Sequence, residues 1–222
     1  MAWPHHHRRT FTLALSFLST LAACGAPEVS QQPQTLYEQA IEARDQGRLE
    51  KAQQLTRSQA DAGDVPAILL LAQIQMMRGQ HRDAAKRLLP LFKQHPENAK
   101  IAGLLASALD GAGRPDEAIA VYARRLTLVP EDVEAALRIA ELLLDRSDAK
   151  HAAAVVLAAL KTAPNKARLH ALLSRALLAR GRTPLAIEAA NRATELAEKS
   201  PEGWLALGTA LSVHGEKNPA IK

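Results

Sequence analysis

One spacing recurs through most of this sequence: a glycine followed five residues later by an alanine. The interval from each pair to the next is 32 residues once and then 34 residues four times over. The pairs are Gly47/Ala52, Gly79/Ala84, Gly113/Ala118, Ser147/Ala152 (with Ser in place of Gly), Gly181/Ala186 and Gly215/Ala220. A fixed period of this length is typical of repeat proteins, in which each unit buries its apolar face against its neighbours.

Composition indicates that each unit is helical. The chain is 47% hydrophobic but only 3% aromatic, and Ala and Leu dominate, a mixture that favours closely packed helices. A small residue stands seven positions before each turn, at Ala40, Ala72, Ala106, Ala140, Ser174 and Gly208. We expect two antiparallel helices per unit that cross closely at this residue and at the alanine after the turn.

These residues resemble the tetratricopeptide repeat (TPR), and the sixth unit is the most similar to its consensus through Trp204, Leu207, Gly208, Gly215 and Ala220. The resemblance implies an all-α fold, a right-handed α-solenoid of antiparallel helix pairs (a TPR-like superhelix). It implies about six repeats with the last truncated. They fall near residues 35–64, 65–98, 99–132, 133–166, 167–200 and 201–222.

Two departures from the period carry expectations of their own. The fifth unit has Glu198 where the second, third and fourth units have proline, and Pro201 comes later, so we expect its second helix to run about one turn longer. In the sixth unit Gly215 predicts a turn and Asn218-Pro219 a second helix of about one turn. The first helix of the sixth unit has an apolar face with Trp204, Leu207 and Leu211. This face would then lack a capping helix.

The N-terminus is typical of an export signal, over residues 1–23. A basic segment, His5 to Arg9, precedes an apolar stretch from Phe11 to Leu21. That stretch is shorter than the ~20 apolar residues that a membrane-spanning helix needs.

Leu21-Ala22-Ala23-Cys24 resembles the lipobox of bacterial lipoproteins. The resemblance implies that Cys24 is lipidated and becomes the new N-terminus, that residues 24–34 form a short tether, and that residues 35–222 form the TPR solenoid. The same resemblance implies that Gly25, after the cysteine, is compatible with the outer membrane, so we expect a lipid-anchored protein of the cell envelope, on the outer membrane facing the periplasm.

Little in the sequence points to catalysis. We find no phosphate-binding glycine loop, no zinc-protease motif and no serine-hydrolase motif. Removal of the leader would leave 26 Lys and Arg against 23 Asp and Glu, too mild and interspersed an excess for nucleic acid. We therefore expect no enzyme, cofactor, metal site, nucleic-acid ligand or small-molecule substrate, and protein partners together with a membrane.

In the TPR family the first helices of the units line a concave groove that binds other proteins. The resemblance therefore implies a mixed protein-binding groove, apolar near the membrane end and charged further along. Its residues would be Tyr37, Ile41, Arg44, Leu69, Gln73, Met76, Lys100, Ser107, Asp110, Leu137, Arg138, Glu141, Arg168, Arg175 and Leu178. The alternative is a solvated groove, with the contact on the convex face or at one end of the solenoid.

The favoured function is an envelope scaffold that assists assembly or localisation of a multiprotein complex, of the pilus, secretion or exopolysaccharide-export type. Two alternatives stay open. One is a regulatory subunit that docks on a cell-wall enzyme. The other is the N-terminal repeat arm of a longer enzyme.

Overall fold

The chain folds into successive helices, most of which have 13 or 14 residues. The computed structural model describes residues 35–217, and over this range it contains eleven helices and no strand. They are α1 (Leu36–Asp45), α2 (Leu49–Asp61), α3 (Val65–Met77), α4 (His81–Gln94), α5 (Ala99–Gly111), α6 (Pro115–Leu128), α7 (Val133–Asp145), α8 (Ala149–Thr162), α9 (Ala167–Ala179), α10 (Thr183–Leu196) and α11 (Pro201–Lys217).

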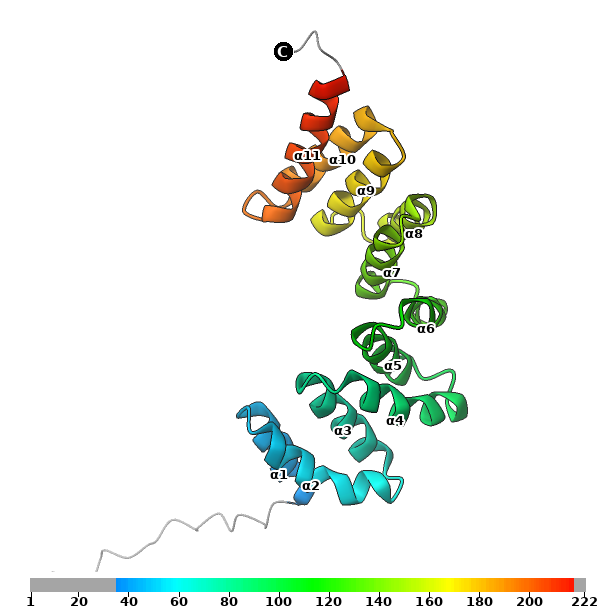
Figure 1. Ribbon diagram of the computed structural model, residues 1–222, viewed down its shortest axis with the longest axis vertical. Coiled ribbons are helices and arrows are strands. Elements are labelled where there is room, and N and C mark those ends of the chain that lie inside the picture. The colour runs from blue at the N-terminus through cyan, green and yellow to red at the C-terminus, as the bar shows by residue number, and fades with distance from the viewer. Residues whose placement is uncertain (1–34, 218–222) are drawn as a thin grey trace, which may run out of the picture. The chain divides into compact units, whose positions relative to one another are not determined.

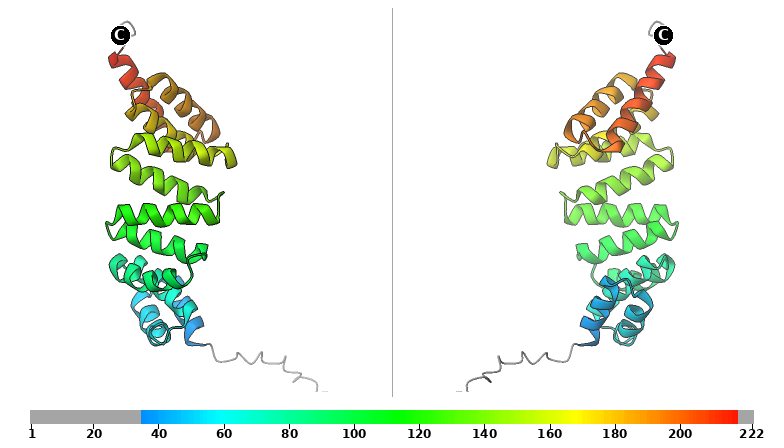
Figure 2. Two further views of the ribbon diagram at one scale, coloured as in Figure 1. Left: turned by 90° about the vertical axis from the view of Figure 1, so that its right-hand side faces the viewer. Right: turned by 90° about the vertical axis from the view of Figure 1, so that its left-hand side faces the viewer.

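The helices stack in chain order within one compact unit, Thr35–Lys222, as Figures 1 and 2 show. Each helix packs against the next, and several odd-numbered helices also touch each other, as α7 and α9 do. We call the odd-numbered helices A helices and the even-numbered ones B helices. The fold is the predicted all-α, TPR-like helical solenoid.

Turn chemistry agrees with the predicted period at five positions. Gly47, Gly79, Gly113 and Gly181 all have φ of 72–73°, the left-handed conformation that ends a helix and that glycine adopts without steric cost. Ser147 takes the same place with φ of 62°. The turn expected at Gly215 is wrong, because α11 continues through that residue to Lys217. The second helix expected from Asn218-Pro219 lies outside the described residues.

The expectation of a longer second helix in the fifth unit is also wrong. That helix, α10, has 14 residues, as do α4, α6 and α8. Ala197 leaves the helix with φ of −148°, in the way that Ala163 does after α8 with φ of −132°. The backbone therefore ends α10 without a proline at position 198.

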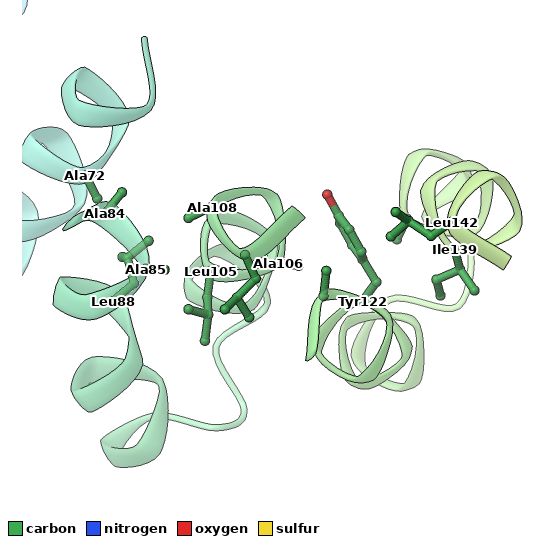
Figure 3. Close-up of a cluster of buried hydrophobic side chains, with 13 residues drawn as sticks. Ala72, Ala84, Ala85, Leu88, Leu105, Ala106, Ala108, Tyr122, Ile139 and Leu142 are labelled. Carbon is green, nitrogen blue, oxygen red and sulfur yellow. The ribbon is translucent and has the colours of Figure 1, made fainter. Parts of the chain in front are cut away.

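The core consists of small residues at the helix crossings with larger aliphatic side chains around them. Ala72, Ala84, Ala106 and Ala118 are fully buried and belong to one cluster that extends from α3 to α7. Figure 3 shows part of this cluster, with the ring of Tyr122 between α5 and α7. Close crossings at alanine are therefore the general rule, and Tyr122 adds one large side chain to this cluster.

Candidate functional site

The spacing of the A helices changes between α5 and α7. Among successive A helices, α5 and α7 have the least backbone packing against each other. The ring of Tyr122, which comes from α6, lies in the space between these two helices (Figure 3). A cleft of about 380 Å³ opens beside it.

Two residues explain why the cleft forms here. Tyr122 is buried at a B-helix position where the other repeats have Thr56, Leu88, Val156 and Ala190, so this repeat holds the bulkiest side chain in that register. Gly103 stands at an A-helix position where neighbouring repeats have leucine or alanine. The guanidinium of Arg125 occupies the space that a β-carbon on Gly103 would fill. A large residue thus lies between the helices, and the missing side chain at Gly103 admits the guanidinium of Arg125.

The walls of the cleft are polar and carry both signs of charge. Its lining comprises Gln73, Lys100, Gly103, Leu104, Ser107, Asp110, Tyr122, Arg125, Asp132, Glu134, Ala135 and Arg138. Three basic side chains therefore face three acidic ones. Lys100 is exposed, and among the described residues it has no ion-pair partner.

Ion pairs fix most of these charges across successive repeats. Arg138 on α7 pairs with Asp110 on α5 and with Glu141, at 2.5 Å from Nη1 to Oε2. Arg168 on α9 then reaches Glu141 at 3.3 Å and Glu134 at 3.5 Å. The hydrogen bond to Asp110 raises the pKa of Arg138 above its ordinary value, so its positive charge is permanent.

Uncharged hydroxyl groups also face the cleft. The Tyr122 hydroxyl lies 3.1 Å from the Ser107 hydroxyl, and either can donate. Burial raises the pKa of Tyr122 above its usual value, an effect that the bond from Ser107 partly opposes. The pair is therefore neutral near pH 7 and can donate to or accept from a peptide backbone.

The predicted groove residues divide between this cleft and other surroundings. Five of them line the cleft, namely Gln73, Lys100, Ser107, Asp110 and Arg138. Glu141 and Arg168 continue its ion pairs onto α9, and Arg44 on α1 donates to Gln73 at 3.4 Å. Arg175 is exposed and Leu178 is half-buried on α9, and neither lines the cleft.

One predicted groove residue is placed wrongly. Leu137 is only 3% exposed and belongs to the core cluster of α7, α8 and α9, because its side of α7 is covered by the following repeat. Four other apolar members, Tyr37, Ile41, Leu69 and Met76, are half-buried and pack against core clusters. Cys24 lies outside the described residues, so its lipidation stays a prediction.

Several cleft residues were missed because they come from positions that the family groove does not use. Tyr122 and Arg125 belong to a B helix, and Asp132 precedes α7. A comparison of the repeats could have identified Tyr122 as the one aromatic side chain in its register. The repeat pattern does not predict the close approach of Arg125 to Gly103. The approach depends on the conformation of a long side chain that lies over a neighbouring helix.

Two further hollows involve B helices. One, of about 700 Å³, is largely polar and is lined by residues of α2, α3 and α4, including Gln53, Gln75 and Arg87. The other, of about 690 Å³, is more apolar and contains Leu157, Leu177 and Leu185. Within residues 35–217, no three His, Cys, Asp or Glu side chains gather as metal ligands. In the same range no helix is long and apolar enough to cross a membrane.

Comparisons with known families and structures agree with this architecture. Two tetratricopeptide repeat models match the chain, one over residues 69–133 and the other over residues 111–176. No curated protein matches it.

Solved structures resemble the fold at low sequence identity. A crystal structure of MamA protein superposes with a TM-score of 0.68 at 19% identity, over 74% of this chain and 91% of that one. MamA 41-end from Desulfovibrio magneticus RS-1 gives 0.60 at 24% identity, over 68% and 84%. A thermophilic TPR protein of Thermus thermophilus gives 0.54 at 18% identity, over 79% and 97%. Together these matches identify the structure as a TPR-like helical solenoid with tetratricopeptide repeats across residues 69–176.

Proposed function

We propose that this protein is a non-catalytic scaffold that binds a segment of another protein in the cleft between α5 and α7. The observation that carries the proposal is the cleft itself, which lies where successive A helices have the least backbone packing. It combines charges of both signs with neutral hydroxyl and amide groups. That chemistry suits the alternating donors and acceptors of a peptide backbone.

The balance of charge supports a peptide ligand over a nucleic acid. Lys100, Arg125 and Arg138 are matched by Asp110, Asp132 and Glu134, whereas nucleic-acid sites concentrate positive charge. Of the three basic groups that line the cleft, Lys100 is the one with no ion-pair partner among the described residues. We expect it to bind a carboxylate of the partner, and Ser107 with Tyr122 to bind main-chain groups.

The proposal extends to the place where the scaffold works. The lipobox-like Leu21-Ala22-Ala23-Cys24 supports a lipid anchor, and Gly25 supports the outer membrane, facing the periplasm. An anchored solenoid would hold its partner at the membrane surface. We therefore propose that it assists assembly or localisation of an envelope complex.

Crosslinking from membranes tests the cleft. A double variant, Lys100→Glu with Ser107→Arg, reverses one charge and fills the cleft with a long side chain. The matched control, Lys150→Glu with Ala154→Arg, makes the same changes at two exposed positions of α8. Both variants should keep the helical circular dichroism of the native protein.

We expect a discrete partner to crosslink to the native protein and to the control, and to be lost from the cleft variant. Equal capture by all three would contradict the cleft assignment and direct attention to the B-helix hollows. Leu137 should not be changed in such a test, because a charge at that buried position would unfold the helix pair.

A further inference from the structure

The polar hollow between α2, α3 and α4, of about 700 Å³, has an apolar counterpart of about 690 Å³ between α8, α9 and α10. Counted from the turn inside each repeat, the two hollows are lined largely by the same positions. Three of these positions hold Arg57, Gln75 and Asp83 in the first hollow and Leu157, Leu177 and Leu185 in the second. The fold therefore forms such a hollow with leucine, and packing alone does not explain the polar side chains.

Gln75 is a buried polar residue at a position that is apolar elsewhere in the solenoid. Its counterparts four residues before the turn, on α1, α5, α7 and α9, are Ala43, Leu109, Leu143 and Leu177. Gln75 is only 6% exposed, and its Oε1 accepts no hydrogen bond. The Oε1 of Gln80, which also lines the hollow, has no partner either. Because a buried amide oxygen without a donor is costly, both side chains favour a ligand that brings hydrogen-bond donors.

Two cations of the hollow also lack partners. Arg57 on α2 and Lys86 on α4 are exposed, and neither has an ion-pair partner among the described residues. The third cation, Arg87, pairs with Asp61 at 2.8 Å. In the apolar hollow, the position of Lys86 is held by Glu188, so the charge that a ligand meets there has the opposite sign.

The helix that carries Lys86 is positive as a whole. It has four Lys or Arg residues against one acidic residue, whereas the corresponding α10 has one against two. Arg82, Lys86 and Lys93 are separated by four and seven positions, so they lie on one side of α4, and all three are exposed. The acidic residue, Asp83, is in the first turn, where the helix dipole favours a negative charge. A ligand of this hollow therefore meets mainly positive charge.

The unpaired groups define the chemistry of the ligand. Arg57 and Lys86 require an anion, while Gln75 and Gln80 require donors. A protein segment with acidic side chains supplies both, because its carboxylates pair with the cations and its main-chain N–H groups donate to the amide oxygens. The phosphodiester group of a lipid or a nucleic acid supplies the anion without an N–H donor. The observations therefore favour an acidic protein segment.

We propose that the hollow between α2, α3 and α4 is a second protein-binding site, which binds an acidic segment of a partner protein through Arg57, Gln75 and Lys86. No residue lines both this hollow and the cleft between α5 and α7. The proposal therefore does not depend on the function proposed for the cleft.

Binding of a defined acidic peptide to the full chain tests the site. The probe is a fluorescein-labelled peptide of alternating glycine and glutamate with blocked ends, and the reference is the same peptide with glutamine in place of glutamate. Fluorescence anisotropy should show saturable binding of the glutamate peptide only. We expect Lys86→Glu to weaken this binding by about tenfold or more, because a charge-assisted bond becomes a repulsion. Lys150→Glu, at an exposed position of α8, makes the same charge change away from the hollow and should leave the affinity nearly unchanged.

A second variant separates binding from a structural role. Gln75→Leu introduces the residue that α9 has at this position, Leu177. Since the amide oxygen of Gln75 has no partner in the fold, we expect the midpoint of urea denaturation to rise while the affinity for the glutamate peptide falls by about fivefold. A fall in stability with unchanged affinity would show that Gln75 serves the packing of the helices and would remove it from the site.

Three results would overturn the proposal. Absence of saturable binding, or equal binding of the two peptides, would show that the hollow does not recognise an acidic segment. Equal weakening by Lys86→Glu and Lys150→Glu would indicate general attraction to a basic protein. Binding to phosphatidylglycerol vesicles that is lost in Lys86→Glu, without binding of the peptide, would assign the positive side of α4 to a membrane surface.

Discussion

Arg138 on α7 binds Asp110 on α5, and these are the two successive A helices with the least backbone packing. The two residues are 28 positions apart in the chain, and side-chain exposures of 37% and 17% leave the pair partly shielded from water. An ion pair thus joins the two repeats at the place where the backbones of their A helices pack least.

This pair should contribute measurably to stability. We expect Arg138→Ala to lower the free energy of unfolding by about 1–2 kcal/mol, because Asp110 and Glu141 would lose their common cation. The measurement is urea denaturation of Arg138→Ala, Asp110→Asn and the double variant, whose coupling should be about 1 kcal/mol. Arg114→Ala, which breaks an exposed pair with Glu117, should cost less than about 0.5 kcal/mol. Equal losses at the two sites would contradict the role of shielding.

Tyr122 should titrate above pH 10. Its pKa is raised because burial penalises the phenolate, so folding favours the protonated form. The stabilisation is therefore complete below pH 10 and is lost as the pH rises through the folded-state pKa. Since the chain has two tyrosines, tyrosinate absorbance in a Tyr37→Phe variant reports Tyr122 alone. In urea the midpoint should fall to about 10; equal midpoints in the two states would refute the prediction.

Lys166 occupies the N-cap position of α9 but does not cap the helix with its side chain. Its register partners Asp64 and Asp132 each accept a bond from a backbone amide of the first turn, at 3.1 and 3.0 Å, whereas Lys166 makes no side-chain cap bond. We expect Lys166→Asp to stabilise the fold by about 1 kcal/mol, through the cap and the helix dipole. Lys166→Ala controls for removal of the lysine charge and should gain much less. Thermal unfolding of both variants provides the comparison.

Ser147 pays a backbone cost that glycine would remove. It is the one described non-glycine residue with positive φ, a conformation unfavourable for residues with a β-carbon. Ser147→Gly should raise the free energy of unfolding by about 0.5–1 kcal/mol. Gly113→Ala, at the same turn one repeat earlier, should lower it by about 1 kcal/mol. Its β-carbon would meet no neighbour, so the effect isolates the backbone. Changes of the same sign would refute this account.

Lipidation at Cys24 is testable without structural information. A Cys24→Ala variant expressed in a diderm bacterium should lose palmitate labelling and its partition into detergent, while a Ser30→Ala variant should keep both. The reason is that only a thiol can form the thioether of the anchor. Palmitate labelling of Cys24→Ala would contradict the lipobox assignment.

The period predicts the fold because local signals and packing repeat together. Gly113 ends a helix, Ala118 allows the crossing that follows, and the same pair recurs in each unit. The prediction of a turn fails where a glycine is not supported by the packing of a following helix. Gly215 has no described B helix after it, and α11 runs on through it.

The candidate site could be predicted only in part. Register identifies Ser107 and Asp110 on the groove side of α5, but it does not show that α5 and α7 pack less closely, with Tyr122 between them. It also assigned Leu137 to the groove, although the next repeat covers that residue. Exposure of an A-helix position depends on how far the following helix lies from it, which is a property of two repeats and not of one.

The near-neighbour packing of the helices has a consequence for regulation. No core cluster extends from the cleft between α5 and α7 to α11, and a solenoid transmits strain mainly between adjacent units. Occupancy of the cleft should therefore stabilise α5 to α7 and leave the stability of α11 nearly unchanged. A bound partner segment would thus slow hydrogen exchange of the backbone amides in the central repeats and not in the last one.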